Sequence, residues 1–292
     1  MMALEEIRRR FVGPANVDWC EANFVKHPLI AEFYNTMSSI PLAVIPLFGV
    51  CYTRFKATRE ARWLVAYLMF SSVGVGSFLF HMTLYYGCQA MDELPMLYCN
   101  LVFMFIFFNE KVPEDRRPYF PWALGAYGVL QTCIYFLFPS LYEFFLFSYI
   151  SLVVVCVVWS YRRITAWHSH PSNRIQARMF WVALAFYGGG SAVWIVENTL
   201  CGVSVVEHSR SDFYHQHQAL HLHAWWHIGS AVGTWLFIQL MLCWRGEELN
   251  KEVGVEWAGL PYTTHSPKER PRPAAPLGEG GARPVASRTR GV

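Results

Sequence analysis

Seven long apolar segments run through this sequence, and they restrict its fold more than any other feature. A helix that crosses a membrane needs about 20 predominantly apolar residues. The composition agrees, because 54% of the residues are hydrophobic and only 15% are charged, whereas soluble domains carry about 25% charged residues. We therefore expect an all-α integral membrane protein, a bundle of seven transmembrane helices. The segments lie at roughly 35–53, 63–84, 93–110, 119–138, 143–161, 179–200 and 223–244.

Basic residues follow every second segment. The loops between them carry a single basic residue, Arg210. By the positive-inside rule, the basic loops and the C-terminus are cytosolic, and the N-terminus is lumenal or extracellular. The cluster Arg8–Arg10 contradicts this locally, but the pattern over six loops outweighs it. The basic loops contain Arg54, Lys56, Arg59 and Arg62, then Lys111, Arg116 and Arg117, then Arg162, Arg163, Arg174 and Arg178.

Three regions follow from this pattern. Residues 1–34 form an N-terminal lumenal segment, 35–245 the seven-helix catalytic bundle, and 246–292 a cytosolic tail. From about residue 263 the tail is rich in Pro, Gly, Arg and Ser and is expected to be disordered. Met1–Val12 has no apolar core, so no cleavable signal peptide is expected. A net charge of only +3 gives no reason to expect a nucleic-acid partner, and no obligate protein partner is predicted.

Three histidines stand out in the apolar segments, where an ionisable group is costly. His223 and His227 open the last segment at a spacing that places both on one helix face. His81 lies near the end of the second segment, and the predicted topology brings all three to the lumenal end. Three histidines with one open position are typical of catalytic zinc, which lowers the pKa of a bound water to about 7. The sequence therefore predicts a zinc enzyme embedded in the membrane.

Other interpretations of these histidines remain open at this point. His217 and His221 form a rival pair at the same spacing, although the pair at 223 and 227 is better placed because it enters the apolar segment. His81 alone is also compatible with a hydrogen-bonded histidine of the bundle interior. A Cys-based zinc finger is disfavoured because the eight cysteines include no Cys-x-x-Cys spacing.

Asp92 and Ser77 accompany the histidines at the same predicted end. Asp92 begins the third segment and is suited to take a proton during attack by water. Ser77 lies one helical turn before His81, so its hydroxyl can face the same water or an oxyanion. Alternatively, Asp92 caps a helix that starts with Asp-Glu-Leu-Pro, and Ser77 belongs to a small-residue packing face over Ser71–Ser77.

An acidic set precedes the first segment. Asp18, Glu21, Asn23 and Glu32 supply oxygen ligands at a density that suits Ca²⁺. Their spacing is not that of an EF-hand loop, so a solvated acidic segment with a helix cap is the alternative.

Together, four stretches closely resemble the alkaline ceramidases over residues of about 13 to 245. The resemblance implies a seven-helix amidase of the endoplasmic reticulum or Golgi membrane. Such an enzyme hydrolyses a lipid of the ceramide or phytoceramide class to a sphingoid base and a free fatty acid. The stretches are Asp18–Asn23 with Ile30–Thr36, Gly76–Leu84, Met91–Met96 and His223–His227.

The resemblance also assigns roles to individual residues. It implies that His81, His223 and His227 bind a catalytic zinc ion, and that Asp92 and Ser77 are the catalytic carboxylate and serine. A structural or regulatory calcium ion falls to Asp18, Trp19 through its carbonyl, Glu21, Asn23 and Glu32. One departure is Trp194-Ile195-Val196-Glu197-Asn198, where we expect Trp-x-x-Asp-Asn. Because Glu197 keeps the charge on a longer arm, its role beside the metal is left open.

Three cysteines, Cys20, Cys88 and Cys201, fall on the predicted oxidising side, where disulfides persist. One pair among them is expected, and the resemblance favours Cys20 with Cys201.

Other functions share parts of this pattern. Receptor-like and GPI-lipid-remodelling members of the same superfamily share the Ser, Asp and three-His chemistry. The acidic segment and His223–His227 favour the ceramidase branch. A metal-binding receptor without hydrolase activity would need a cytosolic interaction segment, and the only long one is the low-complexity tail. A metal transporter would need polar groups along the whole membrane path, whereas here they gather at one end.

Overall fold

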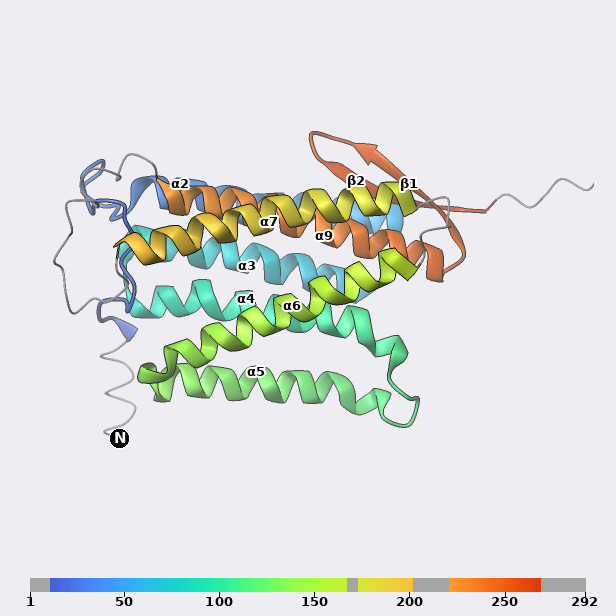
Figure 1. Cartoon of the computed structure of the whole chain (residues 1–292), viewed down its shortest axis with the longest axis horizontal. Coiled ribbons are helices and arrows are strands. Elements are labelled where there is room, and N and C mark those ends of the chain that lie inside the picture. Colours follow the sequence, from blue (N-terminus) through green and yellow to red (C-terminus); the bar gives the residue numbers. More distant parts are fainter. Residues whose placement is uncertain (1–10, 167–172, 202–220, 269–292) are drawn as a thin grey trace, which may run out of the picture.

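Seven long helices form an elongated bundle in the computed structural model, which describes residues 11–166, 173–201 and 221–268 (Figure 1). All seven are long and apolar enough to cross a membrane. The predicted all-α seven-helix membrane bundle is therefore confirmed. The helices are α2 (Phe33–Tyr52), α3 (Ala61–Thr83), α4 (Tyr86–Phe108), α5 (Phe120–Leu137), α6 (Tyr142–Ala166), α7 (Asn173–Cys201) and α9 (Leu222–Glu248).

Short helical pieces flank the long helices. A π-helix, η1 (Thr53–Ala57), extends α2, and three 3₁₀ pieces adjoin α4, α5 and α6. These three pieces are η2 (Asn109–Lys111), η3 (Arg117–Tyr119) and η4 (Pro139–Leu141).

The third helix starts seven residues before its predicted beginning at 93. Its first two turns carry the polar residues Gln89 and Asp92, which resemble a loop in sequence. Gln89 is fully buried, and its side-chain oxygen accepts a hydrogen bond from the Asn16 backbone N–H at 2.8 Å. A partner distant in sequence therefore allows polar residues to remain inside the helix.

The C-terminal segment forms a β-hairpin at the end of the bundle. Strand β1 (Lys251–Trp257) pairs antiparallel with β2 (Pro261–Pro267), and Gly259 adopts a φ of 79° in the turn. Thr263 is buried, and its backbone N–H donates to Gln239 Oε1 on α9 at 2.8 Å. The expectation of disorder from about residue 263 is wrong for β2, because composition does not reveal the polar partners that α9 supplies. Residues 269–292 lie outside the described residues.

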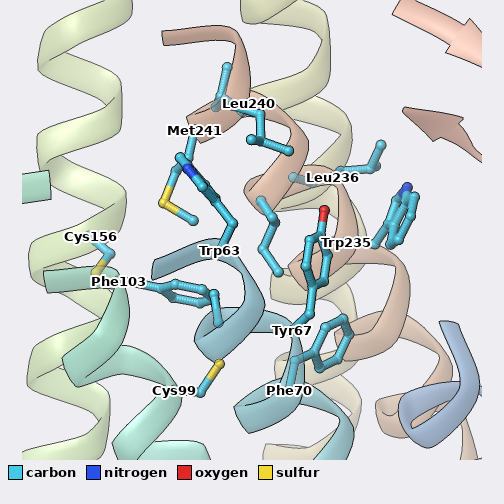
Figure 2. Packing of buried hydrophobic residues seen from close by; sticks show 14 of the residues in the cluster. Trp63, Tyr67, Phe70, Cys99, Phe103, Cys156, Trp235, Leu236, Leu240 and Met241 are labelled. Carbon is cyan, nitrogen blue, oxygen red and sulfur yellow. The ribbon is translucent and has the colours of Figure 1, made fainter. Parts of the chain in front are cut away.

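Helix α9 forms the centre of the bundle, and α5 lies at its periphery. Within the apolar stretch of α9, 72% of the residues are buried, against 17% within that of α5. Figure 2 shows Trp63, Tyr67 and Phe70 of α3 packed with Trp235 of α9 in the main hydrophobic cluster. Inside a membrane the lipid is as apolar as these side chains, so van der Waals packing between the helices stabilises the cluster.

Two glycines let α3 approach both of its neighbours. A Cβ on Gly74 would lie 2.1 Å from the Ala43 backbone nitrogen of α2, and one on Gly76 would lie 1.8 Å from the Met91 carbonyl oxygen of α4. Small residues permit such close helix contacts in membranes. The contact at Gly76 brings the next residue of α3, Ser77, alongside α4 near Asp92.

Candidate metal centre and catalytic site

The N-terminal segment covers the end of α3. The last carbonyls of a helix lack partners within the helix. Here the Met82 and His81 carbonyls accept hydrogen bonds from the backbone N–H groups of Ala31 and Glu32, each at 3.0 Å. Helix α3 ends at Thr83, and the capping residue Leu84 has a φ of 53°. This capping places the Glu32 side chain beside the His81 ring.

Three histidines from α3 and α9 meet at this end of the bundle. His81, His223 and His227 are buried, and each offers one ligand atom, with all of these atoms within 4.8 Å of one another. In the part of the chain that the structure describes, no other group of three or more His, Cys, Asp and Glu side chains is this close. The residues predicted to hold zinc are thus brought together.

Outer partners orient two of the rings. His81 Nδ1 lies 2.5 Å from Glu32 Oε2, and His227 Nδ1 lies 2.8 Å from Ser38 Oγ. Because the Ser38 hydroxyl donates to the Asn35 carbonyl at 3.0 Å, its oxygen is left to accept a hydrogen bond from the N–H at His227 Nδ1. Both rings then present Nε2 as a lone-pair donor, as in metal sites where the second ring nitrogen is held by an outer group.

His223 is held from two sides. Its Nδ1 lies 3.3 Å from Glu197 Oε2 of α7, although the two atoms are not in hydrogen-bond geometry. The Trp19 ring stacks on the other side, with ring centroids 3.9 Å apart. Glu197 Oε1 also accepts the Cys20 backbone N–H at 3.2 Å. The longer arm of Glu197 therefore reaches both His223 and the N-terminal segment.

Asp92 and Ser77 lie next to the histidines. Asp92 is inside α4, so the interpretation of Asp92 as a helix cap is wrong. Its carboxylate interacts with the Ser77 hydroxyl, and Ser77 Oγ lies 3.2 Å from His227 Nε2 and 2.9 Å from Ser39 Oγ. The neighbouring glycines make the close helix contacts, whereas the Ser77 hydroxyl faces the polar cluster.

A cavity of about 340 Å³ opens from this cluster into the bundle. Ser77, Asp92 and His223 line its polar end. The rest of the wall is largely apolar and includes Phe180 and Phe237. Small-molecule pockets combine such apolar walls with a few polar groups that fix the orientation of the ligand.

The chemistry of the three histidine side chains fits a zinc ion. His81 Nε2 is buried and has no hydrogen-bond partner among the described residues. Buried polar atoms normally have partners, so an orphan at the centre of three facing imidazoles indicates a ligand. Three nitrogen donors beside a cavity match a zinc site with an open position.

A family model for ceramidases matches residues 13–264. The chain belongs to the ceramidase family. It is a hydrolase of that family, as the resemblance predicted. Among its relatives, alkaline ceramidase 3 of Mus musculus is 28% identical over 252 residues, which cover 82% of this chain and 87% of the mouse protein.

Alkaline ceramidases of other organisms are also similar to this chain. Alkaline ceramidase 1 of Homo sapiens is 27% identical over 226 residues, covering 73% of this chain and 76% of the human protein. An alkaline ceramidase of Caenorhabditis elegans is 25% identical over 253 residues, covering 82% and 86% of the two chains.

Of the rival histidine pair, the structure describes His221. Its ring lies against Tyr34 in a tilted arrangement, with ring centroids 3.8 Å apart, and it does not belong to the three-histidine group. His217 lies outside the described residues.

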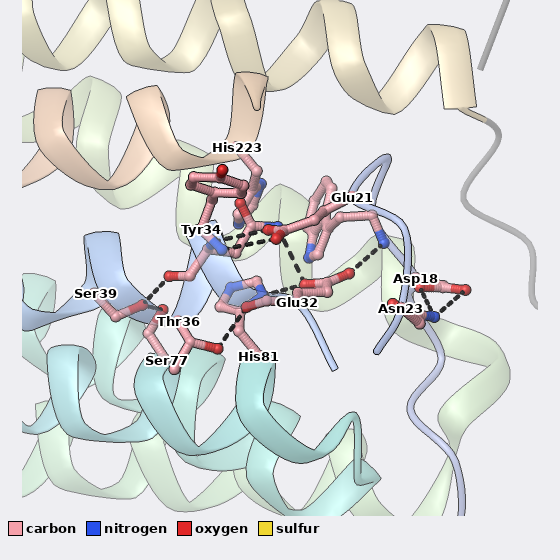
Figure 3. Close-up of polar contacts among 12 residues, drawn as sticks. Asp18, Glu21, Asn23, Glu32, Tyr34, Thr36, Ser39, Ser77, His81 and His223 are labelled. Carbon is pink, nitrogen blue, oxygen red and sulfur yellow. Dashed lines mark hydrogen bonds and ion pairs between the residues drawn. The ribbon is translucent and has the colours of Figure 1, made fainter. Parts of the chain in front are cut away.

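The acidic segment surrounds the start of α2, next to the histidines (Figure 3). Glu21 accepts hydrogen bonds from the backbone N–H groups of Tyr34 at 2.7 Å and Asn35 at 2.9 Å. Asp18 accepts from the Asn23 amide at 3.1 Å. Asn23 Oδ1 is buried without a hydrogen-bond partner among the described residues. An orphan oxygen beside carboxylates fits a hard cation such as Ca²⁺.

Negative charge is concentrated in this segment. Burial raises the pKa of Glu32, and the nearby charge of Asp18 adds to that effect. Burial also raises the pKa of Glu21, with a further contribution from the charge of Glu32. These three carboxylates do not approach one another as closely as the ligand atoms of the histidines do. A cation would relieve the mutual repulsion of these carboxylates.

Cys20 takes part in a disulfide, and Cys88 is a free thiol. The side chain of the predicted partner, Cys201, lies outside the described residues, so the pairing stays a prediction.

Sequence reasoning missed the residues that support the site. Ser38 has no distinguishing spacing, and its partner His227 is distant in the sequence. For Glu197, the sequence leaves the role open. Only the departure from the expected Trp-x-x-Asp-Asn drew attention to Glu197.

Proposed function

We propose that this ceramidase is a zinc-dependent amidase that hydrolyses the amide bond of ceramides, releasing a sphingoid base and a free fatty acid. The observation that carries the proposal is the placement of the three buried histidines beside Asp92 and Ser77 at the polar end of an apolar cavity. A cavity of this kind suits the amide of a two-chain lipid, because the hydrocarbon can occupy the apolar part.

His81, His223 and His227 would hold the zinc ion, which would supply Lewis-acid polarisation of the amide carbonyl and an activated water. Asp92 takes the proton from the attacking water and passes it to the leaving nitrogen as the carbon–nitrogen bond breaks. Ser77, which contacts both Asp92 and His227, donates a hydrogen bond to the developing oxyanion.

The same proposal includes a structural or regulatory calcium ion. Asp18, Glu21, Asn23, Glu32 and the Trp19 carbonyl would provide the oxygen ligands. Glu32 then serves both centres, since one of its oxygens contacts His81 and the other accepts the Trp19 backbone N–H at 3.1 Å. Calcium would thereby fix the carboxylate that orients a zinc ligand.

We further propose that the protein lies in the endoplasmic reticulum or Golgi membrane, with the histidine end of the bundle on the lumenal side. The hairpin, which contacts α9 and η1, shares its end of the bundle with the basic loop that follows α2. The positive-inside rule makes that end cytosolic. Accessibility labelling of a cysteine introduced at Lys251 or at Phe24 in sealed vesicles tests this orientation.

The decisive experiment is purification in detergent, followed by metal analysis and measurement of fatty-acid release from a panel of ceramides and phytoceramides. His223→Ala should lose both zinc and hydrolysis. The matched control is His221→Ala, two residues earlier and outside the cluster, which should keep both. Release from a GPI lipid but from no ceramide would contradict the proposed substrate. Full activity in His223→Ala would show that the metal ligands are assigned wrongly.

A further inference from the structure

A second carboxylate borders the same cavity, and the proposed mechanism does not use it. Glu93 follows Asp92 on α4, is buried, and lines the cavity wall. Its Oε1 accepts hydrogen bonds from Gln89 Nε2 at 3.1 Å and from the Tyr142 hydroxyl at 2.7 Å. Its Oε2 accepts one from the Tyr135 hydroxyl at 2.6 Å.

Glu93 has spare capacity to accept hydrogen bonds. Each carboxylate oxygen can accept about two, and among the described residues Oε2 has one donor, the Tyr135 hydroxyl. No Lys, Arg or His forms an ion pair with Glu93 in the part of the chain that the structure describes. An ionisable group within a membrane span is costly and generally marks a functional position.

A purely structural role explains part of this network. Gln89 also accepts the Asn16 backbone N–H, so the network joins the N-terminal segment to α4, α5 and α6. Gln89 and Tyr135 lie away from the cavity lining and fit that role. Glu93 and Tyr142, however, both line the cavity, where a ligand can reach them.

We propose that Glu93 determines substrate specificity by accepting a hydrogen bond from a sphingoid-base hydroxyl next to the scissile amide. This inference rests on the proposed function. In a ceramide, the carbon attached to the amide nitrogen lies between a hydroxymethyl group and a hydroxyl-bearing carbon. Asp92 and Glu93 line the same cavity, so a lipid with its amide at Asp92 can bring a neighbouring hydroxyl to Glu93. The substrate class is therefore an N-acyl amino alcohol, and simple N-alkyl amides are disfavoured.

The test compares kcat/KM for a ceramide and for its 1-deoxy and 3-deoxy analogues, with the wild-type enzyme and Glu93→Gln. The wild type should prefer the ceramide over at least one analogue by about tenfold or more, since that analogue leaves the carboxylate without its donor. In Glu93→Gln this preference should fall to within about twofold, because kcat/KM should decrease more for ceramide than for the analogue.

Tyr135→Phe is the matched control, because it removes a donor to the same carboxylate away from the cavity. It should lower hydrolysis of all three lipids by one common factor and keep the preference. The inference is overturned if Glu93→Gln also lowers all three equally, or if the wild type does not discriminate. Where the variant fails to fold, the wild-type comparison can still overturn the inference. A wild type that hydrolyses no ceramide at all contradicts the proposed function itself, which is a distinct result.

Discussion

The two ends of the bundle both bury polar groups, but they satisfy them differently. At the hairpin end, Gln239 accepts the Thr263 N–H with its side-chain oxygen and donates to the Tyr67 hydroxyl at 2.9 Å. At the histidine end, His81 Nε2 and Asn23 Oδ1 lack hydrogen-bond partners among the described residues. At the hairpin, the protein itself supplies the partners of Gln239 and Thr263, whereas the histidine end provides donor atoms for ligands.

Buried polar groups with complete hydrogen bonding stabilise a fold, whereas unpaired ones are costly and need an explanation. The difference between the ends therefore separates structure from function. Substitutions at the histidine end should change metal binding, turnover or both, and those at the hairpin end should change only stability. The five predictions below test that separation.

The largest effect should come from His81→Ala. Loss of one of three ligands should remove the zinc and lower hydrolysis at least about 10³-fold, since zinc supplies the activated water. Metal analysis and fatty-acid release from the purified variant measure both losses. A variant that retains zinc and turnover would remove the functional distinction between the two ends.

Asp92→Asn should keep zinc bound and lower turnover by roughly 10²-fold or more, because an amide cannot act as a general base. Ser77→Ala should cost on the order of 10²-fold if its hydroxyl stabilises the oxyanion. The measurement is kcat with zinc content determined on the same sample. Reduced expression with normal specific activity would instead assign Ser77 to helix packing.

Ser38→Ala should weaken zinc binding about 10- to 100-fold, because the hydroxyl that orients His227 is lost. Competition with a zinc chelator measures this affinity independently of activity. Ser38→Thr is the conservative control and should restore most of the affinity. Equal zinc affinities in all three proteins would rule out an orienting role for Ser38.

Asp18→Asn should weaken calcium binding by about tenfold, since Ca²⁺ favours charged oxygen ligands. Thermal unfolding across a calcium titration should show a shifted midpoint, while the zinc content stays constant. If the wild-type unfolding temperature does not depend on calcium, no calcium ion contributes at this end.

The smallest effect should come from Glu60→Gln at the hairpin end. Burial raises the pKa of Glu60, but the hydrogen bond from Arg245 and the charges of Arg62 and Arg245 outweigh it and lower the pKa below 4.5. The ion pair should contribute about 1 kcal/mol or less. Because the folded pKa is depressed, this contribution is present above the unfolded pKa and is lost as pH falls through the folded pKa. Thermal unfolding should distinguish the variant from the wild type at pH 7 but not in strong acid, with hydrolysis unaffected.

The sequence by itself was sufficient to predict seven membrane helices, because long apolar segments have few alternatives to spanning a bilayer. It also singled out His81, Asp92 and His227 as site candidates, since ionisable residues are conspicuous in such segments. Helix α4 was predicted to start late, because the polar residues of its first turns resemble a loop when their tertiary partners are unknown.

Only the tertiary structure decided how the site is supported. Ser38 meets His227 across 189 positions of sequence, and Glu197 contacts the Cys20 backbone across 177. No local spacing encodes such contacts, because the packing of α2, α7 and α9 creates them. The hairpin was likewise hidden by its composition, since α9 supplies the polar partners that bury Thr263. The length and apolarity of the segments identified the membrane helices, and long-range packing selected the groups that orient each histidine.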